Sequence, residues 1–420
     1  MDALRINGGH LLKGTVHISG AKNACLPILA ATILTQDDCH IQNVPDLVDV
    51  KTMVKLIESL GAEARLEKNA IHLSHKAMSS HEAPYELVRT MRASALVLGP
   101  LLSRFGRAKV SLPGGCAIGN RPLDQHLKGL EKLGAEIEIT HGYIDAKANR
   151  LQGNEIIFDF PTVGGTENLL LAASLANGES VLRNCACEPE IEDLAECLIK
   201  MGVEIEGAGS KTIHIQGQPE LKGFNHHVIA DRIEFGTFLI AGALMGDPLE
   251  IKGGLRKHQL PLFAKLQEAN IQIDVSEDED TIKVRQSKDI RPLDLQTAPY
   301  PGFPTDMQAQ MMTLLSLANG TSMITETIFE NRFMHTPELN RLGADIRIKG
   351  REAAIYGVAG LSGSTVMATD LRASASLVLA GLVAEDTTTI RRIYHLDRGY
   401  AHIENKLKKL GAEIERFKEE

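Results

Sequence analysis

A short motif recurs along the chain and constrains the fold more than any other feature of the sequence. Five copies have the form LGAE or a close variant and begin at Leu60, Leu133, Met201, Leu342 and Leu410. A sixth, degenerate copy, LQEANIQID, occurs near Glu268, where the spacing predicts one. The period of about 70 residues is too long for a solenoid repeat and suits a small α/β unit. Each copy predicts an amphipathic helix that ends at a glycine and is followed by a strand.

A second element recurs in the same six units, a helix that is apolar on nearly every face. Its copies are AKNACLPILAATIL, TMRASALVLGPLL, GGTENLLLAASLA, DRIEFGTFLIAGALM, TDMQAQMMTLLSLA and DLRASASLVLAGLVA. Helices of this kind are expected in the interior, with the strands outside them. Six copies divide into two domains of three, and the repeats place the joint near residue 230. The predicted fold is therefore α/β, with two domains of three repeated units, helices inside and sheets outside.

The residues at the starts of these six helices are mostly basic. In chain order they are Lys22, Arg92, Thr166, Arg232, Asp306 and Arg372. A helix N-terminus carries a partial positive charge, so a cation there is unfavourable for the isolated helix. Either each basic side chain extends to solvent, or the cations gather around an anion, because helix N-termini with adjacent Arg and Lys suit phosphate and carboxylate. We infer a cleft between the domains that holds a polyanionic small molecule, with further cations from Arg121, Arg332 and Arg398.

Asp306 is the acidic exception in this series. It follows the stretch YPGFPT, whose prolines stiffen the approach to the helix. Two interpretations are open: Thr305 or Asp306 caps the following helix, or Asp306 is a general base in the cationic cleft. Nearby Arg and Lys should keep its carboxylate ionised. This favours the general base, and capping would not exclude it.

The stretch SLPGGCAIGNRP, residues 111–122, places Cys116 in a glycine-rich loop five residues before Arg121. A free cysteine is usually a buried core residue, so a thiol in such a loop needs a chemical reason. The neighbouring Arg121 should lower the pKa of the thiol and make it open to alkylation. Gly114, Gly115 and Gly119 would let the loop close over a ligand and exclude water.

Composition removes several classes of function. The net charge of −9 argues against nucleic-acid and anionic-membrane partners. The N-terminus MDALRINGGH lacks the pattern of a signal peptide, and no apolar run is long enough for a membrane span. Six sparse cysteines predict a reducing cytoplasm and no disulfide framework. No HExxH, paired CxxC or Walker motif is present, so we expect no metal, no cofactor and no ATP hydrolysis.

Several motifs together resemble one enzyme family along essentially the whole chain. They are GAKNACLPILAA, MRASALVLGPL, SLPGGCAIGNRPLDQH, YPGFPTDMQAQ, FENRFMHTPEL, TDLRASASLVLAG and DRGYAHIENKL. The chain is similar to the UDP-N-acetylglucosamine 1-carboxyvinyltransferases, enolpyruvyl transferases that open peptidoglycan synthesis. The resemblance implies an inside-out α/β barrel in two domains, 22–229 and 1–21 plus 230–420, with the active site in the cleft between them.

The resemblance also implies a reaction. The family transfers the enolpyruvyl group of phosphoenolpyruvate to the 3′-hydroxyl of UDP-N-acetylglucosamine and releases phosphate, by addition and elimination through a tetrahedral ketal. It uses no metal or cofactor, and no obligate protein partner is evident. Such a reaction needs an acid that protonates the methylene carbon and a base that takes the hydroxyl proton.

Residue roles follow from the same resemblance. Lys22, Arg121 and Arg398 would bind phosphoenolpyruvate. Cys116 would donate the proton to carbon, form a covalent adduct, and be alkylated by the family's epoxide antibiotic fosfomycin, and Asp306 would accept the hydroxyl proton. The UDP-sugar would contact Asn23, Arg92, Arg121, Pro122, Leu123, Asp124, Gln125, Thr162, Val163, Gly164, Asp306 and Ile328. Residues expected to shape the cleft and its closure, without taking part in the chemistry, are Arg232, Arg332, Asp370 and Arg372.

One position departs from the family, which commonly carries a lysine near the diphosphate where this chain has Phe160-Pro161. A neighbouring basic group or water would replace that contact. Two alternatives remain open. One is transfer to shikimate 3-phosphate by the sister enzymes, which do not carry a thiol in a matching PGGC motif. The other is a non-catalytic anion-binding paralogue, against which Lys22, Cys116, Asp306 and Arg398 are all present.

Overall fold

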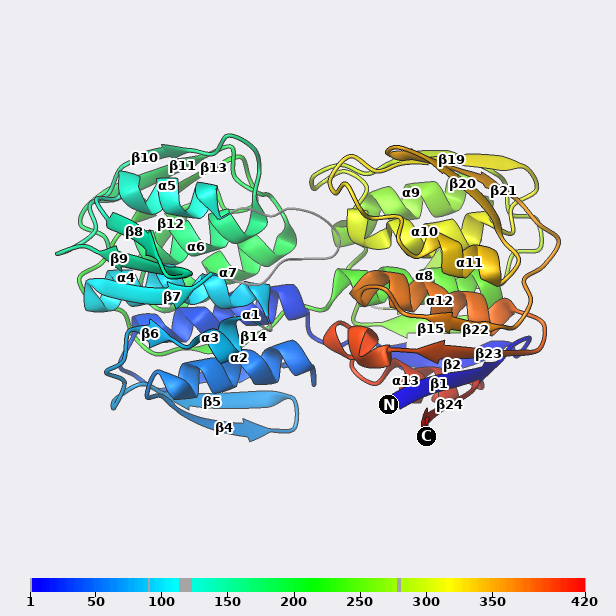
Figure 1. Ribbon diagram of the computed structural model, residues 1–420, viewed down its shortest axis with the longest axis horizontal. Coiled ribbons are helices and arrows are strands. Elements are labelled where there is room, and N and C mark those ends of the chain that lie inside the picture. Colours follow the sequence, from blue (N-terminus) through cyan, green and yellow to red (C-terminus); the bar gives the residue numbers. More distant parts are fainter. Residues whose placement is uncertain (1, 90, 113–122, 278–280, 420) are drawn as a thin grey trace. The chain divides into compact units, whose positions relative to one another are not determined.

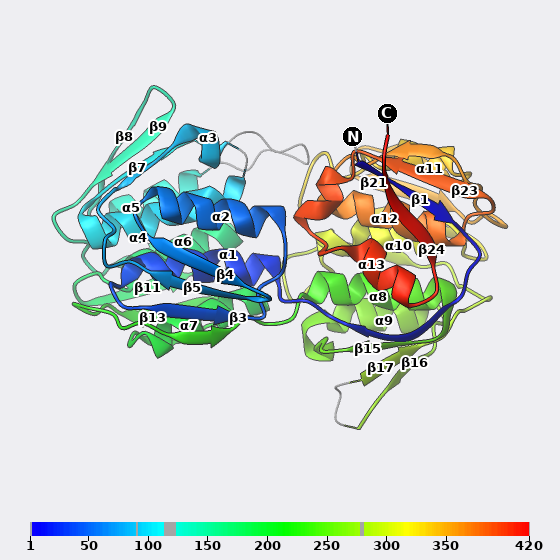
Figure 2. The same cartoon turned by 90° about the horizontal axis from the view of Figure 1, so that it is seen from below.

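The computed structural model describes residues 2–89, 91–112, 123–277 and 281–419. Internal contacts divide the chain into two compact units. One unit contains the residues up to Ser19 and from Ala230 onward, and the other contains the described residues from Gly20 to Ile229. In each unit, helices are flanked by sheets (Figures 1 and 2).

The unit from Gly20 to Ile229 contains three four-stranded sheets within its described residues. In each sheet the first two strands are parallel and the other pairs are antiparallel. In spatial order, the first sheet contains β14 (Asn225–His227), β3 (Cys39–Gln42), β5 (Ala70–Ser74) and β4 (Glu63–Glu67). The second contains β6 (Glu82–Ala83), β7 (Arg107–Ser111), β9 (Tyr143–Lys147) and β8 (Glu136–Thr140). The third contains β10 (Glu155–Ile157), β11 (Glu179–Arg183), β13 (Thr212–Gln216) and β12 (Glu204–Glu206).

The other unit repeats the same topology in its described residues. Its sheets are β2 (Leu12–His17), β15 (Gly246–Lys252), β17 (Thr281–Val284) and β16 (Ile273–Val275); β18 (Asp294–Gln296), β19 (Thr321–Thr325), β21 (Glu352–Tyr356) and β20 (Asp345–Lys349); and β22 (Thr365–Met367), β23 (Thr387–Arg391), β1 (Asp2–Asn7) and β24 (Glu413–Lys418). Strand β1 lies between β23 and β24, so the first residues of the chain complete a sheet of the unit that contains its end.

The apolar helices form the interior of each unit. One unit contains α1 (Lys22–Ala31), η2 (Arg92–Val97) with α4 (Leu98–Phe105), and α6 (Val163–Ala173); the other contains α8 (Arg232–Met245), η4 (Thr305–Met307) with α10 (Gln308–Leu315), and α12 (Leu371–Val383). Every residue of α8 from Ile233 to Met245 is buried. Helices α8, α10 and α12 contact one another (Figure 1). The prediction of helices inside and sheets outside is confirmed.

Helices that have an exposed face alternate with the buried ones along the chain. They are α2 (Val48–Ser59), α5 (Asp124–Lys132), α7 (Pro189–Lys200), α9 (Leu260–Glu268), α11 (Thr336–Arg341) and α13 (Ile403–Lys409). Short helices connect these elements: η1 (Thr32–Leu34), α3 (Tyr85–Val88), η3 (Arg256–Gln259) and η5 (Ile393–Arg398).

The repeated glycine has the same structural role in five of the six units. It is the second residue after the end of a helix, in the left-handed backbone region that glycine adopts at no steric cost. The φ angles lie between 94° and 107° at Gly61, Gly134, Gly202, Gly343 and Gly411. The degenerate copy places Asn270 there with a φ of 67°, and asparagine is among the few other residues that tolerate this conformation. The repeat predicted from the sequence is thus a repeat of structure.

Buried histidines make the fold sensitive to acid. Burial lowers the pKa values of His75, His126, His258 and His335 to about 4, from the ordinary histidine value of about 6.5. Each histidine is therefore neutral in the folded protein at pH 6, while its unfolded counterpart takes up a proton as the pH falls below 6.5. Stability is full above pH 6.5 and is lost as the pH falls toward 4, by up to roughly 3 kcal/mol for one fully buried histidine.

We predict a flatter pH dependence for His75→Leu, because His75 is fully buried and neither ring nitrogen has a hydrogen-bond partner among the described residues. The free energy of unfolding in urea should fall less between pH 7 and pH 4.5 for this variant than for the wild type. Equal losses in the two proteins would show that His75 does not carry the effect.

Candidate active site

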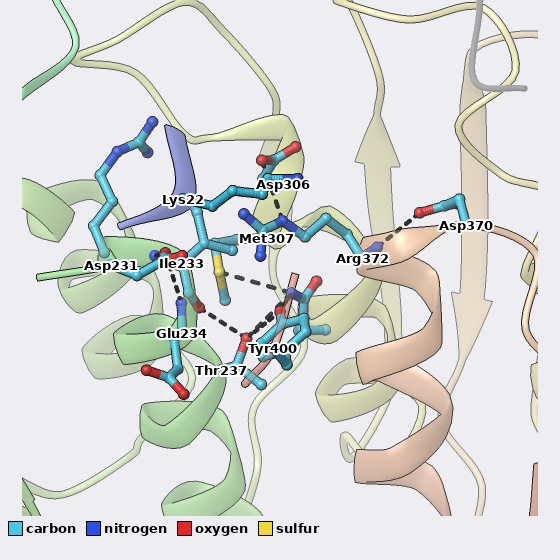
Figure 3. A network of polar contacts seen from close by, with 12 residues as sticks. Lys22, Asp231, Ile233, Glu234, Thr237, Asp306, Met307, Asp370, Arg372 and Tyr400 are labelled. Atoms are coloured by element: carbon cyan, nitrogen blue, oxygen red, sulfur yellow. Dashed lines mark hydrogen bonds and ion pairs between the residues drawn. The ribbon is translucent and has the colours of Figure 1, made fainter. Parts of the chain in front are cut away.

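Asp306 lies at the start of one buried helix, between two buried arginines. Its Oδ1 accepts a hydrogen bond from Arg332 Nη2 at 2.8 Å. Its Oδ2 accepts one from Arg372 Nε at 3.3 Å (Figure 3). The Arg332 and Arg372 side chains are 4% and 2% exposed, while the Asp306 side chain is 26% exposed. Arg372 therefore does not extend to solvent. The two arginines fix the carboxylate while leaving part of it open.

The charge on Asp306 follows from these contacts. Burial alone would raise the pKa of its carboxyl group, but the positive charges of Arg332, Arg372 and Arg232 outweigh burial and hold the pKa well below its usual range. The prediction of an ionised carboxylate agrees with this shift. Arg332 and Arg372, expected only to shape the cleft and its closure, also contact the acidic side chain directly.

Helix capping does not account for Asp306. Neither η4 nor α10 has a side-chain cap hydrogen bond at its N-terminus. Thr305 Oγ1 instead donates to Glu326 Oε2 at 2.8 Å. The alternative in which Thr305 or Asp306 is the cap is therefore wrong.

Two other acidic residues of the same unit do cap helices. Asp370 caps α12 by accepting from the backbone N–H groups of Arg372 and Ala373, and Asp231 caps α8 in the same way (Figure 3). Asp370 thus places the backbone from which Arg372 extends toward Asp306.

A buried polar network lies beside Arg372. The Arg372 guanidinium carbon is 5.4 Å from the centre of the Tyr400 ring, within the range of a cation–π contact. The Tyr400 hydroxyl lies 2.9 Å from Thr237 Oγ1 (Figure 3), and it lies 3.2 Å from Gln310 Nε2. Tyr400 follows Arg398 by two residues, so the network joins the segment of Arg398, which is itself half-buried at the end of η5, to α8 and α10.

In the other unit, Lys22 is the first residue of α1 and is only 7% exposed. Its Nζ lies 3.3 Å from Oδ2 of Asp49, whose side chain is 6% exposed and belongs to the first turn of α2. Lys22 therefore does not extend to solvent either. Asn23 and Arg92, at the starts of α1 and η2, are half-buried.

The segment Thr162–Gly164 begins α6. Thr162 Oγ1 caps this helix by accepting from Gly165 N at 3.3 Å. Gly164 lies against His126, because a Cβ at this position would be 3.3 Å from His126 Cε1. Phe160, which precedes this segment, is half exposed.

Asn168 sets the tautomer of His126. Its Oδ1 accepts from Gly99 N at 2.8 Å, so its Nδ2 is the donor that lies 3.0 Å from His126 Nδ1. Nδ1 therefore accepts, and the proton of the neutral ring is on Nε2. Burial and the charge of Arg92 lower the pKa of His126 to about 4. The result is a neutral N–H donor next to Gly164.

The start of α5 is tied to the same region. Gln125 Nε2 donates to Asp159 Oδ2 at 2.7 Å, and Gln125 Oε1 accepts from Asp159 N at 3.0 Å. Leu123 and Asp124 are half-buried beside it. The predicted sugar-nucleotide residues of this unit thus come from the starts of α1, η2, α5 and α6.

Three predicted residues, Cys116, Arg121 and Pro122, lie outside the described residues. Residues that the sequence did not single out include Asp49, His126, Asn168 and Glu326. Each is a buried partner of a predicted residue or of its neighbour in the chain. No local signal marked them, because pairings across 27 residues (Lys22 and Asp49) or 21 residues (Thr305 and Glu326) exist only in the fold.

Two further properties concern the described part of the chain. No group of three or more His, Cys, Asp and Glu side chains there is arranged to hold a metal ion. No helix there is long and apolar enough to cross a membrane.

Solved structures share this fold. The enolpyruvyl transferase NikO from Streptomyces tendae matches with a TM-score of 0.90 and 28% sequence identity, over 100% of this chain and 99% of that one. EPSP synthase from Acinetobacter baumannii matches with a TM-score of 0.78 over 100% of both chains, and its 16% identity supports the fold alone.

Sequence relatives are much closer. UDP-N-acetylglucosamine 1-carboxyvinyltransferase from Anaeromyxobacter sp. strain K is 56% identical over 100% of both chains, and the enzyme of the same name from Geotalea daltonii is 54% identical over 100% of both. The family model described as EPSP synthase (3-phosphoshikimate 1-carboxyvinyltransferase) matches residues 6–407. The chain therefore belongs to the EPSP synthase family of enolpyruvyl transferases and, within it, to the UDP-N-acetylglucosamine 1-carboxyvinyltransferases.

Proposed function

We propose that this protein transfers the enolpyruvyl group of phosphoenolpyruvate to the 3′-hydroxyl of UDP-N-acetylglucosamine and releases phosphate. The observation that carries the proposal is the 56% identity, without loss of coverage, to enzymes named for this activity. We further propose that it acts in the cytoplasm, in the first committed step of peptidoglycan synthesis.

The first half of the reaction is an addition. The sugar hydroxyl oxygen bonds to C2 of phosphoenolpyruvate, the vinyl electron pair takes a proton at C3, and the hydroxyl proton leaves to a base. The product is a tetrahedral ketal that still carries phosphate. In the second half a proton leaves the new methyl group, the double bond re-forms, and the C–O bond to phosphate breaks.

Asp306 is the proposed base of the addition. A carboxylate held by two arginines is a weak base, because their charges favour its ionised form. A weak base is sufficient here, because the hydroxyl proton becomes strongly acidic once its oxygen bonds to carbon. Arg332 and Arg372 keep the carboxylate ionised and oriented, which is the state that accepts a proton.

Cations hold the second substrate. Lys22, Arg121 and Arg398 are the proposed ligands of phosphoenolpyruvate, which carries both a phosphate and a carboxylate. Asp49 keeps the Lys22 ammonium group at the start of α1, with an N–O distance of 3.3 Å. Because the lysine is ordered before the substrate arrives, less conformational entropy is lost on binding.

Cys116 is the proposed proton donor to the methylene carbon, and it should be the thiol that electrophiles attack. Burial raises the pKa values of Cys39 and Cys185 to about 12, and it also raises those of Cys25, Cys187 and Cys197. Thiols with raised pKa values hold little of the reactive thiolate at neutral pH.

We predict that fosfomycin adds once to the protein, at Cys116. Intact-mass spectrometry and peptide mapping should show a single adduct there, and Cys116→Ser should show none. Cys187 is the internal control, because it is the most exposed of the cysteines within the described residues. An adduct on Cys187 or on any buried cysteine would refute the assignment.

The proposed function is tested by the product. Purified protein incubated with phosphoenolpyruvate and UDP-N-acetylglucosamine should yield a UDP-sugar whose mass has increased by one enolpyruvyl group, with a vinyl ether at the 3′ position by NMR. Recovery of unchanged UDP-sugar would contradict the proposal.

A further inference from the structure

Glu326 is a buried carboxylate without an assigned role in the reaction. It follows β19 and is 1% exposed. Its two oxygens accept four hydrogen bonds, from the hydroxyls of Thr297 and Thr305 and from the backbone N–H groups of Ile328 and Phe329. A buried carboxylate is costly unless its charge is met by donors, and these four meet it. The four donors come from three segments that are separate in the sequence.

One oxygen of Glu326 holds the helix start that carries Asp306. Oε2 accepts from Thr305 Oγ1 at 2.8 Å. Thr305 is the residue before Asp306 and the first residue of η4. Fixing its side chain fixes the backbone from which the Asp306 carboxylate projects.

The other oxygen holds the segment after β19. Oε1 accepts from Ile328 N at 2.8 Å, from Phe329 N at 3.2 Å and from Thr297 Oγ1 at 2.9 Å. Thr297 follows β18, the strand paired with β19. Oε1 therefore shapes a tight turn around Ile328, the proposed contact of the UDP-sugar in this unit.

The segment after β19 also contacts Asp306, through Arg332. The Arg332 guanidinium carbon is 5.5 Å from the centre of the Phe329 ring, and Arg332 Nη2 donates to Asp306 Oδ1 at 2.8 Å. Glu326, Thr305, Asp306, Arg332 and Phe329 thus form a closed ring of contacts and chain links. Glu326 reaches Asp306 along both sides of this ring.

We propose that Glu326 is a positioning residue of the transfer reaction, with a separate task for each oxygen. Oε2 sets the position of the base Asp306 through Thr305, and Oε1 sets the sugar-nucleotide turn at Ile328. The proposal rests on the proposed function, because it takes the roles of Asp306 and Ile328 from it. Loss of the Oε2 contact should lower kcat, and loss of the Oε1 contacts should raise the KM for the UDP-sugar.

The Oε2 contact is tested by a matched pair at Thr305. Thr305→Val keeps the shape of the side chain and removes the hydroxyl, whereas Thr305→Ser keeps the hydroxyl. We expect Thr305→Val to lower kcat at least about tenfold with an unchanged KM for the UDP-sugar, because small displacements of a catalytic group are costly. Thr305→Ser should stay near the wild-type kcat. Equal kcat values for wild type and Thr305→Val would overturn this half of the proposal.

The Oε1 contacts are tested at Glu326 itself. Glu326→Gln keeps one oxygen for Thr297, Ile328 and Phe329, and presents an NH2 group to Thr305, whose hydroxyl can turn to accept it. This variant should keep the wild-type KM for the UDP-sugar. Glu326→Ala removes all four contacts, and should raise that KM about tenfold and lower kcat as well.

A purely structural role predicts a different result. It would lower the melting temperature of the variants and leave kcat and KM of the folded fraction unchanged, and that outcome would overturn the proposal. If Glu326→Ala does not fold, the Thr305 pair still decides the task of Oε2, and a raised KM for the UDP-sugar in Glu326→Gln would still contradict the task of Oε1. The wild type is assayed first: no transfer to UDP-N-acetylglucosamine would refute the proposed function, whereas an active wild type with kinetically unchanged variants would refute only the role of Glu326.

Discussion

Replacing Asp306 with asparagine should lower kcat by about a thousandfold, the usual size of a general-base contribution, and leave substrate affinity close to that of the wild type. Asparagine has the same shape and keeps an oxygen that can accept from Arg332 or Arg372, the two donors to Asp306. It has no negative charge with which to take the hydroxyl proton. The measurement is steady-state kcat together with the Kd for the UDP-sugar from calorimetry.

The control for this substitution is Asp345→Asn. Asp345 also pairs with an arginine, Arg347, at 3.1 Å, but its side chain is 44% exposed on β20. It should show wild-type kinetics and stability, because exposed pairs contribute little. Wild-type kcat in Asp306→Asn would remove Asp306 from the chemistry. Loss of UDP-sugar binding in this variant would make it a binding residue instead.

Replacing Asp49 with asparagine should lower the free energy of unfolding by about 3 kcal/mol, because it breaks a buried ion pair by removing one charge. The side chains of Lys22 and Asp49 are 8% and 6% exposed, so solvent cannot take over the lost interaction. The KM for phosphoenolpyruvate should rise in the same variant, because Lys22 loses the carboxylate that orients it. Urea unfolding and steady-state kinetics measure the two effects.

The chain offers a matched control for Asp49. Asp38 pairs with Lys76 at 3.1 Å, and both side chains are more than two-thirds exposed. Asp38→Asn should therefore leave stability and kinetics nearly unchanged. In addition, Lys22→Met combined with Asp49→Leu should recover stability but not activity. An Asp49→Asn protein as stable as the wild type would show that the pair does not hold the start of α1.

The fold could be predicted from the sequence because its signals are local and repeated. The turn after each amphipathic helix needs a left-handed backbone at one residue, and five of the six units have glycine at that residue. A helix that is apolar on all faces can only be buried, and α8 is buried from its second residue to its last. Repetition made even the degenerate copy around Asn270 recognisable.

The arrangement of the site could be predicted only in part. The basic helix starts were visible, and Lys22 and Arg372 do begin or nearly begin α1 and α12. Their partners were not predictable, because a buried cation is held by whichever carboxylate the tertiary fold brings to it. Asp49 contacts Lys22 from a different helix, and Arg332 contacts Asp306 from a loop 26 residues away. The sequence left open that these basic side chains extend to solvent. In the structure, Lys22 and Arg372 instead form buried ion pairs with carboxylates.

The most direct test of the account measures phosphate released from phosphoenolpyruvate with two acceptors in parallel. The purified protein should release phosphate in proportion to added UDP-N-acetylglucosamine, and should release none above background with shikimate 3-phosphate. Asp306→Asn and Cys116→Ser serve as matched inactive controls in the same assay. Turnover with shikimate 3-phosphate alone would assign the protein to the sister reaction, and no turnover with either acceptor would contradict the account altogether.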